Sequence, residues 1–159
     1  TTLTYFVKKH TLNMTFNCVN SKYYVPYKGQ YNANHYEGDV CEVFIGSSVD
    51  HKTYYEIEVT PENDIYLAKI EYIDKKDGAF ELKHDFVENN FIKSNVAKTR
   101  KGYKVNILIN LDDLLTGRDI FYFNAYRIET EGGTPEKNLL AVNPTMKRSF
   151  HVPEKFIKL

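Results

Sequence analysis

Tryptophan is absent from this chain of 159 residues, and cysteine and methionine each occur only twice. The two cysteines, Cys18 and Cys41, form no CxxC pair and have no histidine at zinc-finger spacing, which excludes a structural zinc site of that kind. Lysine plus arginine equal aspartate plus glutamate at 21 each, so the formal net charge is zero. A neutral chain offers no electropositive field to phosphates, and we expect no nucleic-acid partner.

Long apolar runs and catalytic signatures are missing as well. No run approaches the ~18 apolar residues that a membrane helix needs, so we expect no membrane insertion. The sequence holds no GxSxG, HExxH, Walker or GxGxxG motif, which removes the common hydrolase and nucleotide-binding patterns. No two histidines are spaced to hold one metal from a single element, and we interpret all five as surface or packing residues: His10, His35, His51, His84 and His151.

Aromatic residues are present in excess, with 13 tyrosines and 10 phenylalanines. Apolar and polar residues alternate with a period of two along most of the chain, which is typical of β-strands, and no stretch carries a sustained helical stripe. We expect a loop at residues 20–38 and one helical turn at 112–115. The expected strands are residues 3–8, 12–19, 39–46, 53–60, 65–73, 79–82, 91–97, 101–111 and 119–130.

Many short strands separated by turn residues predict an all-β fold, a two-sheet antiparallel β-sandwich of the jelly-roll or immunoglobulin-like kind. The chain has the length of one domain and contains no linker or repeat, so residues 1–159 are expected to form a single domain. Residues 119–130 carry large side chains on both faces. Such a strand needs a core on one side and a cleft or cover on the other.

Each cysteine falls in the alternating pattern of apolar residues along its expected strand. Cys18 continues an alternating apolar set that begins at Leu12, and Cys41 leads into Val43 and Ile45. Both therefore belong to the inward phase, and we expect buried thiols. A disulfide between them is the alternative, and it requires Cα atoms ~4.4 to 6.8 Å apart.

Glu56 and Glu58 project from the same face of one expected strand. Such a pair is usually a solvated strand edge, or a set of ligands for a Ca²⁺ ion that ties strands together. It is also the pair of groups that acid and base catalysis of glycoside hydrolysis requires. These three interpretations stay open at the level of the sequence.

Tyrosines gather in the expected loop, at positions 23, 24, 27, 31 and 36. A flat ring offers an apolar face to the C–H face of a pyranose, and its hydroxyl can bond a sugar hydroxyl. Stacking on nucleobases would also need an electropositive track, which this neutral chain lacks. The loop therefore indicates a sugar site, with simple packing of the loop onto the sandwich as the alternative.

Several blocks resemble, in order and spacing, the family nine carbohydrate-binding modules and their stand-alone relatives. They are residues 39–45 (DVCEVFI), 54–59 (YYEIEV), 123–128 (FNAYRI), 139–145 (LLAVNPT) and 149–156 (SFHVPEKF). The resemblance implies a non-catalytic β-sandwich that is exported with, or attached to, polysaccharide-degrading systems, its signal segment having been removed. It requires no cofactor beyond the structural Ca²⁺ that such modules often hold.

The resemblance also implies where a sugar would bind. In xylanase-linked members two tryptophans enclose a terminal sugar. Tyr36 stands near the first of these positions, while Val142 occupies the second and is followed by Asn143.

Two further residues complete the predicted site. Glu42 lies on the face of its strand away from the core phase and would accept hydrogen bonds from sugar hydroxyls. Arg127 would present a bidentate fork to ligand oxygens, or form a structural pair with Glu42 or Glu129. The sequence thus predicts non-catalytic carbohydrate binding in a loop-lined aromatic cleft built from Tyr36, Glu42, Arg127 and Asn143.

Two other functions remain open. A glycosidase would use the Glu56 and Glu58 pair, or Glu42, as its carboxyl groups. A protein-interaction module would use the same fold, as would a haem-binding sandwich, for which Met14, Met146 and His151 are the available ligands. Met14, the first methionine, belongs to the inward set of its strand, which argues against haem.

Overall fold

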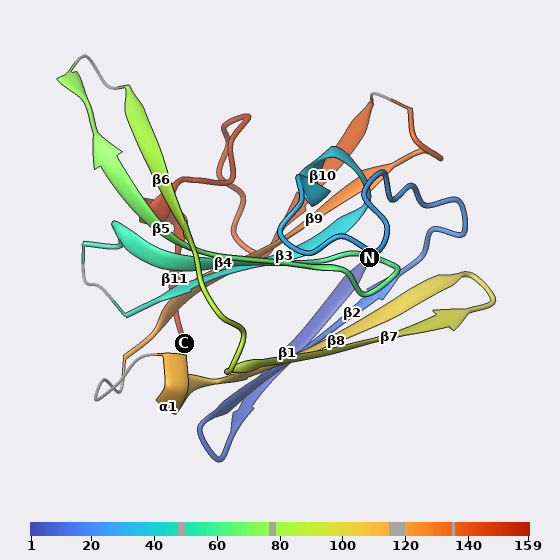
Figure 1. The fold of residues 1–159 in the computed structure, drawn as a ribbon, viewed down its shortest axis with the longest axis horizontal. Coiled ribbons are helices and arrows are strands. Elements are labelled where there is room, and N and C mark those ends of the chain that lie inside the picture. The colour runs from blue at the N-terminus through green and yellow to red at the C-terminus, as the bar shows by residue number, and fades with distance from the viewer. Residues whose placement is uncertain (48–49, 77–78, 115–119, 135) are drawn as a thin grey trace.

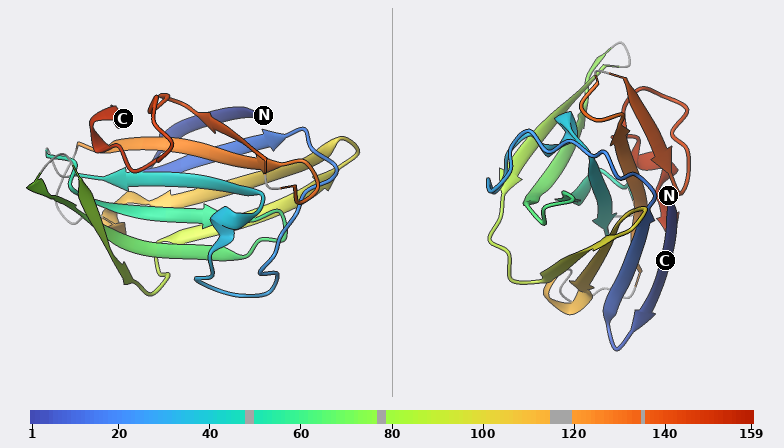
Figure 2. Two further views of the ribbon diagram at one scale, coloured as in Figure 1. Left: turned by 90° about the horizontal axis from the view of Figure 1, so that it is seen from above. Right: turned by 90° about the vertical axis from the view of Figure 1, so that its right-hand side faces the viewer.

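Two antiparallel sheets packed face to face make up the fold in the computed structural model, which describes residues 1–47, 50–76, 79–114, 120–134 and 136–159. Figure 1 shows the smaller sheet below the larger one, and Figure 2 shows the layers from two further directions. The all-β sandwich expected from the sequence is confirmed. In the described part of the chain, no helix is long and apolar enough to span a bilayer.

The smaller sheet has four strands in the order β1-β2-β8-β7. Their bounds are Thr2–Lys8 for β1, Thr11–Cys18 for β2, Ile92–Thr99 for β7 and Gly102–Asn110 for β8. Lys9 and His10 join β1 to β2 with φ angles of 48° and 57°. Positive φ at both central residues suits the two-residue hairpin turn whose twist matches the strands, so this turn helps to fix the register of the hairpin.

The larger sheet runs in the order β10-β9-β3-β4-β5-β6, and β11 joins it by pairing with β9. Its strands are β3 (Val40–Gly46), β4 (Thr53–Val59), β5 (Ile65–Asp74), β6 (Phe80–Phe86), β9 (Tyr122–Thr130), β10 (Lys137–Ala141) and β11 (Ile157–Lys158). Short helices lie in the connections: η1 (His35–Glu37), α1 (Leu111–Leu114) and η3 (Pro153–Lys155).

Strand alternation builds the main core between the sheets. The inward residues of β2 and β8 pack against those of β3, β4 and β9, and full burial of each large apolar side chain stabilises the fold by roughly 1.5 to 3 kcal/mol relative to exposure. Cys18 and Cys41 are both buried in this core, as expected, and so is Met14. Other members are Leu12, Phe16, Val43, Ile45, Ile57, Val59, Val105, Ile107, Ile109, Phe123 and Ala125.

The larger sheet also buries part of its other face, and this second layer positions the site. The C-terminal segment, residues 142–156, lies against that face, and Figure 1 shows it in red on the side away from the smaller sheet. The two-sided pattern of β9 is confirmed, because Phe123 packs in the main core while Tyr126 packs in this second cluster. The buried members of the second cluster are Phe44, Tyr54, Tyr66, Ala68, Ile70, Tyr126 and Phe156.

One strand is longer than expected. The sequence pattern predicts a strand at 79–82, whereas β6 pairs with β5 from Phe80 to Phe86. The pattern misses the second half because β6 is an edge strand, where charged residues such as Lys83 and Asp85 remain in solvent.

The expected helical turn is present as α1, which begins at Leu111. Two short strands, β10 and β11, lie in residues for which the sequence pattern predicts no strand. Other expected positions lie outside the described residues. Parts of the expected turns, of the helical turn and of the 119–130 strand fall there: Ser48, Asp77, Gly78, Leu115, Asp119 and Pro135.

Candidate functional site

A cavity of about 330 Å³ opens on the second face of the larger sheet, beside η1 and the C-terminal segment. It combines aromatic rings with carboxyl groups and imidazoles, and we call it the acidic cavity. Its lining residues are Asn34, Tyr36, Glu56, Glu58, Tyr66, His84, Phe86 and His151.

Three carboxyl groups gather at the acidic cavity because of strand phase and register. Glu56 and Glu58 alternate with inward-facing Ile57 on β4, and Glu42 on β3 is paired directly with Glu58. The side chains of Glu42, Glu56 and Glu58 are buried, with exposures of 2%, 6% and 1%. One oxygen of each lies within 4.8 Å of the others. Glu56 and Glu58 line the cavity, whereas Glu42 lies next to Glu58 and does not reach the wall.

Burial dominates the ionisation of these carboxyl groups. Loss of hydration raises the pKa of Glu56 to about 8. The pKa values of Glu42 and Glu58 are raised well above their ordinary range, first by burial and then by the neighbouring acids. Among the described residues, Glu42 Oε1, Glu56 Oε2 and Glu58 Oε2 have no hydrogen-bond partner. Glu56 is therefore mostly protonated at pH 7, and the pKa values of Glu42 and Glu58 are shifted in the same direction.

Two histidines flank Glu56 without neutralising it. His84 Nδ1 and His151 Nε2 each lie 3.9 Å from a carboxyl oxygen of Glu56. Burial lowers the pKa of His151 to about 4 and also lowers the pKa of His84, so both imidazoles are neutral at pH 7. The hydroxyls of Tyr54 and Tyr66 hold the rings through 2.7 Å hydrogen bonds with Nδ1 of His151 and His84, respectively.

Aromatic rings form the open side of the acidic cavity. Tyr36, in η1, is 48% exposed, and Phe86, at the end of β6, is 60% exposed. Phe86 packs edge-on against Tyr66 with ring centroids 5.6 Å apart. Lys137 donates a 2.6 Å hydrogen bond to the backbone oxygen of Tyr36, which anchors η1, and its ammonium group also lies 5.8 Å from the centroid of the Tyr36 ring.

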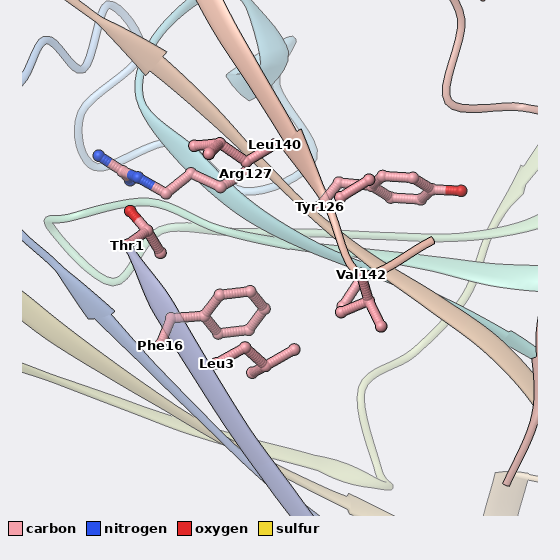
Figure 3. Close-up of a pocket in the computed structure, with 9 residues that line it drawn as sticks. Thr1, Leu3, Phe16, Tyr126, Arg127, Leu140 and Val142 are labelled. Atoms are coloured by element: carbon pink, nitrogen blue, oxygen red, sulfur yellow. The ribbon is translucent and has the colours of Figure 1, made fainter. Parts of the chain in front are cut away.

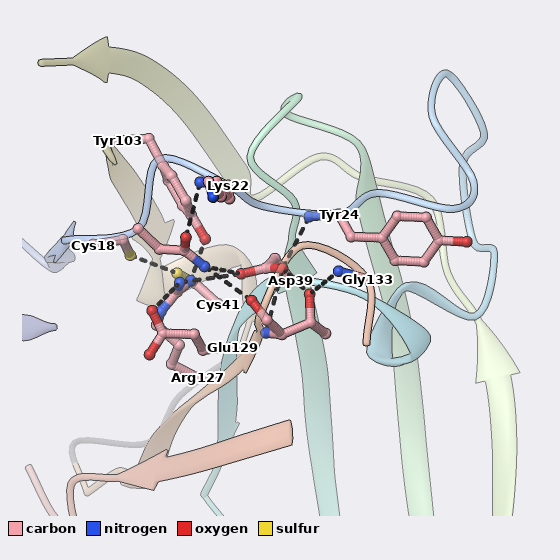
Figure 4. Close-up of polar contacts among 11 residues, drawn as sticks. Cys18, Lys22, Tyr24, Asp39, Cys41, Tyr103, Arg127, Glu129 and Gly133 are labelled. Carbon is pink, nitrogen blue, oxygen red and sulfur yellow. Dashed lines mark hydrogen bonds and ion pairs between the residues drawn. The ribbon is translucent and has the colours of Figure 1, made fainter. Parts of the chain in front are cut away.

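Arg127 is not in the acidic cavity, contrary to the sequence-based site. It pairs in register with Cys41 and so shares the inward face of β9, whereas Glu42 pairs with Tyr126 on the other face. Its guanidinium lies 3.2 Å from Asp39 Oδ1 and 3.5 Å from Glu129 Oε1, and it also donates to the hydroxyl of Tyr103 (Figure 4). The structural pairing with Glu129 is confirmed, and the pairing with Glu42 is wrong.

Asp39, which the sequence patterns do not single out, is the centre of this network. Its carboxylate accepts hydrogen bonds of 2.5 Å from the Thr130 hydroxyl, 3.0 Å from the Tyr24 backbone N–H and 3.2 Å from the Asn20 amide. Figure 4 shows these contacts converging from the loop and from β9. Asp39 therefore fastens the start of the tyrosine-rich loop to the sheet.

Asn143 also has a structural place. Its side-chain amide donates to the Lys155 carbonyl at 2.8 Å, and its backbone N–H donates to Asn124 Oδ1 at 3.1 Å. Asn124 in turn donates to the Asn143 carbonyl at 2.8 Å. These bonds hold the C-terminal segment against β9, and Asn143 does not line the acidic cavity.

Val142 and Arg127 instead border a separate cavity of about 270 Å³ at the open side of the sandwich. Figure 3 shows it between the start of β1 and the β9/β10 pair, with Leu3 and Phe16 on its lower side. Of the four predicted site residues, Tyr36 and Glu42 meet around Glu58, whereas Arg127 and Asn143 lie elsewhere. The lining residues that the predicted sugar site does not include are Asn34, Glu56, Glu58, Tyr66, His84, Phe86 and His151.

The alternation of Tyr54, Glu56 and Glu58 is the sequence signal that could have located the cavity. Placing His84 and His151 required knowledge of the fold, because they come from an edge strand and from the C-terminal segment.

The three carboxyl groups fit a metal ion in donor type, since Ca²⁺ prefers hard oxygen ligands. They form the group that could hold a metal within the described residues, and each has an unpartnered oxygen. Glu42, Glu56 and Glu58 would be the residues to hold Ca²⁺ here, and the ion would tie β3 to β4.

No protein-family model and no curated protein matches this chain. Solved structures do. Two structures of a family 9 carbohydrate-binding module from Caldicellulosiruptor kristjanssonii, one with cellotriose and one with glucose, superpose with TM-scores of 0.64 and 0.67. Each covers 98% of this chain, and the match covers 71% and 73% of those chains.

The fold is that of a family 9 carbohydrate-binding module. A candidate carbohydrate-binding protein from Bacteroides uniformis shares it, with a TM-score of 0.65 over 93% of this chain and 71% of that one. Sequence identities are 12% to 13%. At this identity the likeness shows the common fold, and the function must be argued from the site.

Proposed function

We propose that the protein binds carbohydrate without altering it, and that the acidic cavity receives the sugar. The observation that carries the proposal is the combination of an exposed Tyr36 ring with the buried carboxyl groups of Glu56 and Glu58, all of which line one cavity. The ring supplies an apolar face for the C–H groups of a pyranose. The carboxyl groups supply directional partners for its hydroxyls.

The size of the acidic cavity favours the end of a sugar chain. At about 330 Å³ it lies near the lower limit of the ~300 to 1,000 Å³ that ligand pockets usually span. The family 9 module from Caldicellulosiruptor kristjanssonii was solved with glucose and with cellotriose. Glucose and its β-linked oligomers are accordingly the first ligands to test.

Export follows from this proposal. A polysaccharide is too large to cross a membrane unaided, so a protein that binds it meets it outside the cytoplasm. We therefore propose that the protein is exported and serves polysaccharide use at or beyond the cell surface.

The ionisation of the carboxyl groups argues against catalysis. Glycoside hydrolysis by two carboxyl groups requires that one is ionised while the other holds a proton, which means that their pKa values are pushed apart. Here burial raises the pKa values of Glu42, Glu56 and Glu58 together. Release of reducing sugar from a glycan panel would show that the glycosidase alternative is correct.

The haem alternative also loses support. Met14 is completely buried between the sheets, Met146 is 88% exposed, and His151 packs on Phe44 on the other face of the larger sheet. These three side chains do not gather at one site.

A glycan array followed by calorimetric titration of the best ligand tests the proposal. We expect saturable binding of at least one glycan, and loss of most of the affinity when Tyr36 is replaced by alanine. Tyr31 is the matched control, because it lies in the same loop, is 52% exposed and does not line the cavity. An array without any bound glycan would contradict the proposed function.

A further inference from the structure

Within the part of the chain that the structure describes, no lysine or arginine forms an ion pair with the carboxyl groups at the acidic cavity. Glu42, Glu56 and Glu58 are each more than nine-tenths buried, and one oxygen of each has no partner among the described residues. The charge of Lys137 acts on Glu42, but its ammonium group donates to the backbone oxygen of Tyr36. Buried carboxyl groups without partners are costly, so a ligand that brings positive charge gains more here than a neutral one.

The rim of the cavity favours an organic cation over a metal ion. The exposed Tyr36 and Phe86 and the buried Tyr66 line the cavity, and the face of an aromatic ring attracts an ammonium group. A divalent metal would use only the carboxyl oxygens and would gain nothing from these rings. A ligand that carries both a pyranose ring and an ammonium group would use the rim and the floor together.

We propose that the sugar bound in the acidic cavity is a cationic amino sugar, a pyranose with an unacetylated ring amino group. The ring would stack at Tyr36, and the ammonium group would donate hydrogen bonds to Glu56 and Glu58. This inference rests on the proposed function and specifies the class of its ligand. It predicts discrimination at a single substituent, because acetylation or replacement by a hydroxyl removes the positive charge.

Three β-1,4-linked trimers that differ only at C2 provide the test: those of glucosamine, glucose and N-acetylglucosamine. Calorimetry at low ionic strength should show the glucosamine trimer binding roughly ten- to a hundredfold more tightly than either neutral trimer, as expected for hydrogen bonds to a charged group. The preference should fall to within about threefold in Glu58→Gln, which keeps the shape of the side chain. Glu71→Gln, an exposed acid on β5 outside the cavity, should retain it.

The possible results separate this inference from the proposed function. Equal binding of the glucose and glucosamine trimers would overturn the amino-sugar inference and leave carbohydrate binding intact, as would a neutral glycan preferred on the array. Absence of any glycan binding would overturn both. Retention of the preference in a folded Glu58→Gln variant, verified by its melting curve, would overturn the inference. Tight binding of Ca²⁺ or Mn²⁺ alone, lost in the same variant, would show that a metal occupies the carboxyl groups and would also overturn it.

Discussion

Glu42 on β3 lies directly opposite Glu58 on β4, and both side chains are almost completely buried. Two acids placed opposite each other destabilise a sheet when both are charged. Folding therefore favours protons on this pair and on neighbouring Glu56, and the stability of the protein becomes linked to pH.

The stability of the ligand-free protein should fall as pH rises from 6.5 to 8. The folded-state pKa of Glu56 is about 8, against an ordinary 4.5, so its stabilising proton is present at low pH and lost as pH rises through 8. The lowered pKa of His151, about 4, acts in the opposite direction but only below 6.5. We expect a loss on the order of 1 to 2 kcal/mol from Glu56 alone, measured by urea denaturation.

Glu56→Gln is the control for this pH dependence. Glutamine resembles the protonated acid and does not ionise, so the variant should lose less stability than the wild type over the same pH interval. A slope that is unchanged in the variant would show that another group causes the pH dependence.

Replacement of Tyr36 by alanine should weaken glycan binding roughly ten- to thirtyfold, or about 1 to 2 kcal/mol, and replacement by phenylalanine should weaken it less. The free energy of unfolding should barely change, because the ring is half exposed and the Lys137 hydrogen bond goes to the backbone. The titration must be followed by calorimetry, because the chain has no tryptophan whose fluorescence could report binding. Wild-type affinity in Tyr36→Ala would place the site elsewhere.

Replacement of Arg127 by alanine should reduce stability by about 3 to 5 kcal/mol, because Asp39 would remain buried without its ion pair. The affinity of the folded fraction for glycan should be unchanged, since Arg127 lies on the inward face of the sheet. Arg148→Ala, at an exposed position, serves as the control and should alter neither quantity. Loss of glycan affinity in a folded Arg127→Ala variant would show that Arg127 contributes to the binding site.

The two cysteines should titrate as two free thiols per chain after denaturation without reductant, and should react slowly in the native protein. Cys18 Sγ and Cys41 Sγ lie 3.7 Å apart across the two sheets, and both side chains are buried. The contact with Cys41 lowers the pKa of Cys18 to about 7, so burial is what limits its reaction. Absence of reactive thiols in the denatured chain would reveal a disulfide.

Structural Ca²⁺ would compete with the cationic sugar for the same three carboxyl groups, and melting curves can decide between the two. An ion held by Glu42, Glu56 and Glu58 would bind only the folded protein. At a hundred times its Kd, it would raise Tm by roughly 5 to 10 °C. Equal melting temperatures in chelator and in millimolar Ca²⁺ would show that no structural Ca²⁺ binds here. The carboxyl groups would then be available to the sugar.

The sequence by itself determined most of the strands and the inward face of the main core. A strand has a period of two, so alternation assigns each side chain to a face without knowledge of the partner strand. Cys18, Cys41 and Met14 were placed correctly in this way, and the two-sided pattern of β9 indicated the second layer. Arg127 is four residues after Phe123 on the same strand, so alternation places both side chains on the face toward the core. Arg127 was not placed there from the sequence because a lone charged side chain is not expected in a core.

Only the tertiary structure decided which residues meet. Asp39 lies far from Arg127 in the chain, and their pairing is what allows the guanidinium to be buried. Glu56 and Glu58 look like a solvated edge in the sequence. In the fold they are buried on β4, an inner strand of the larger sheet, and the distant C-terminal segment places His151 3.9 Å from Glu56. Periodicity is a property of one strand, whereas a site is made where separate segments come together, and that depends on register, sheet order and the path of the loops.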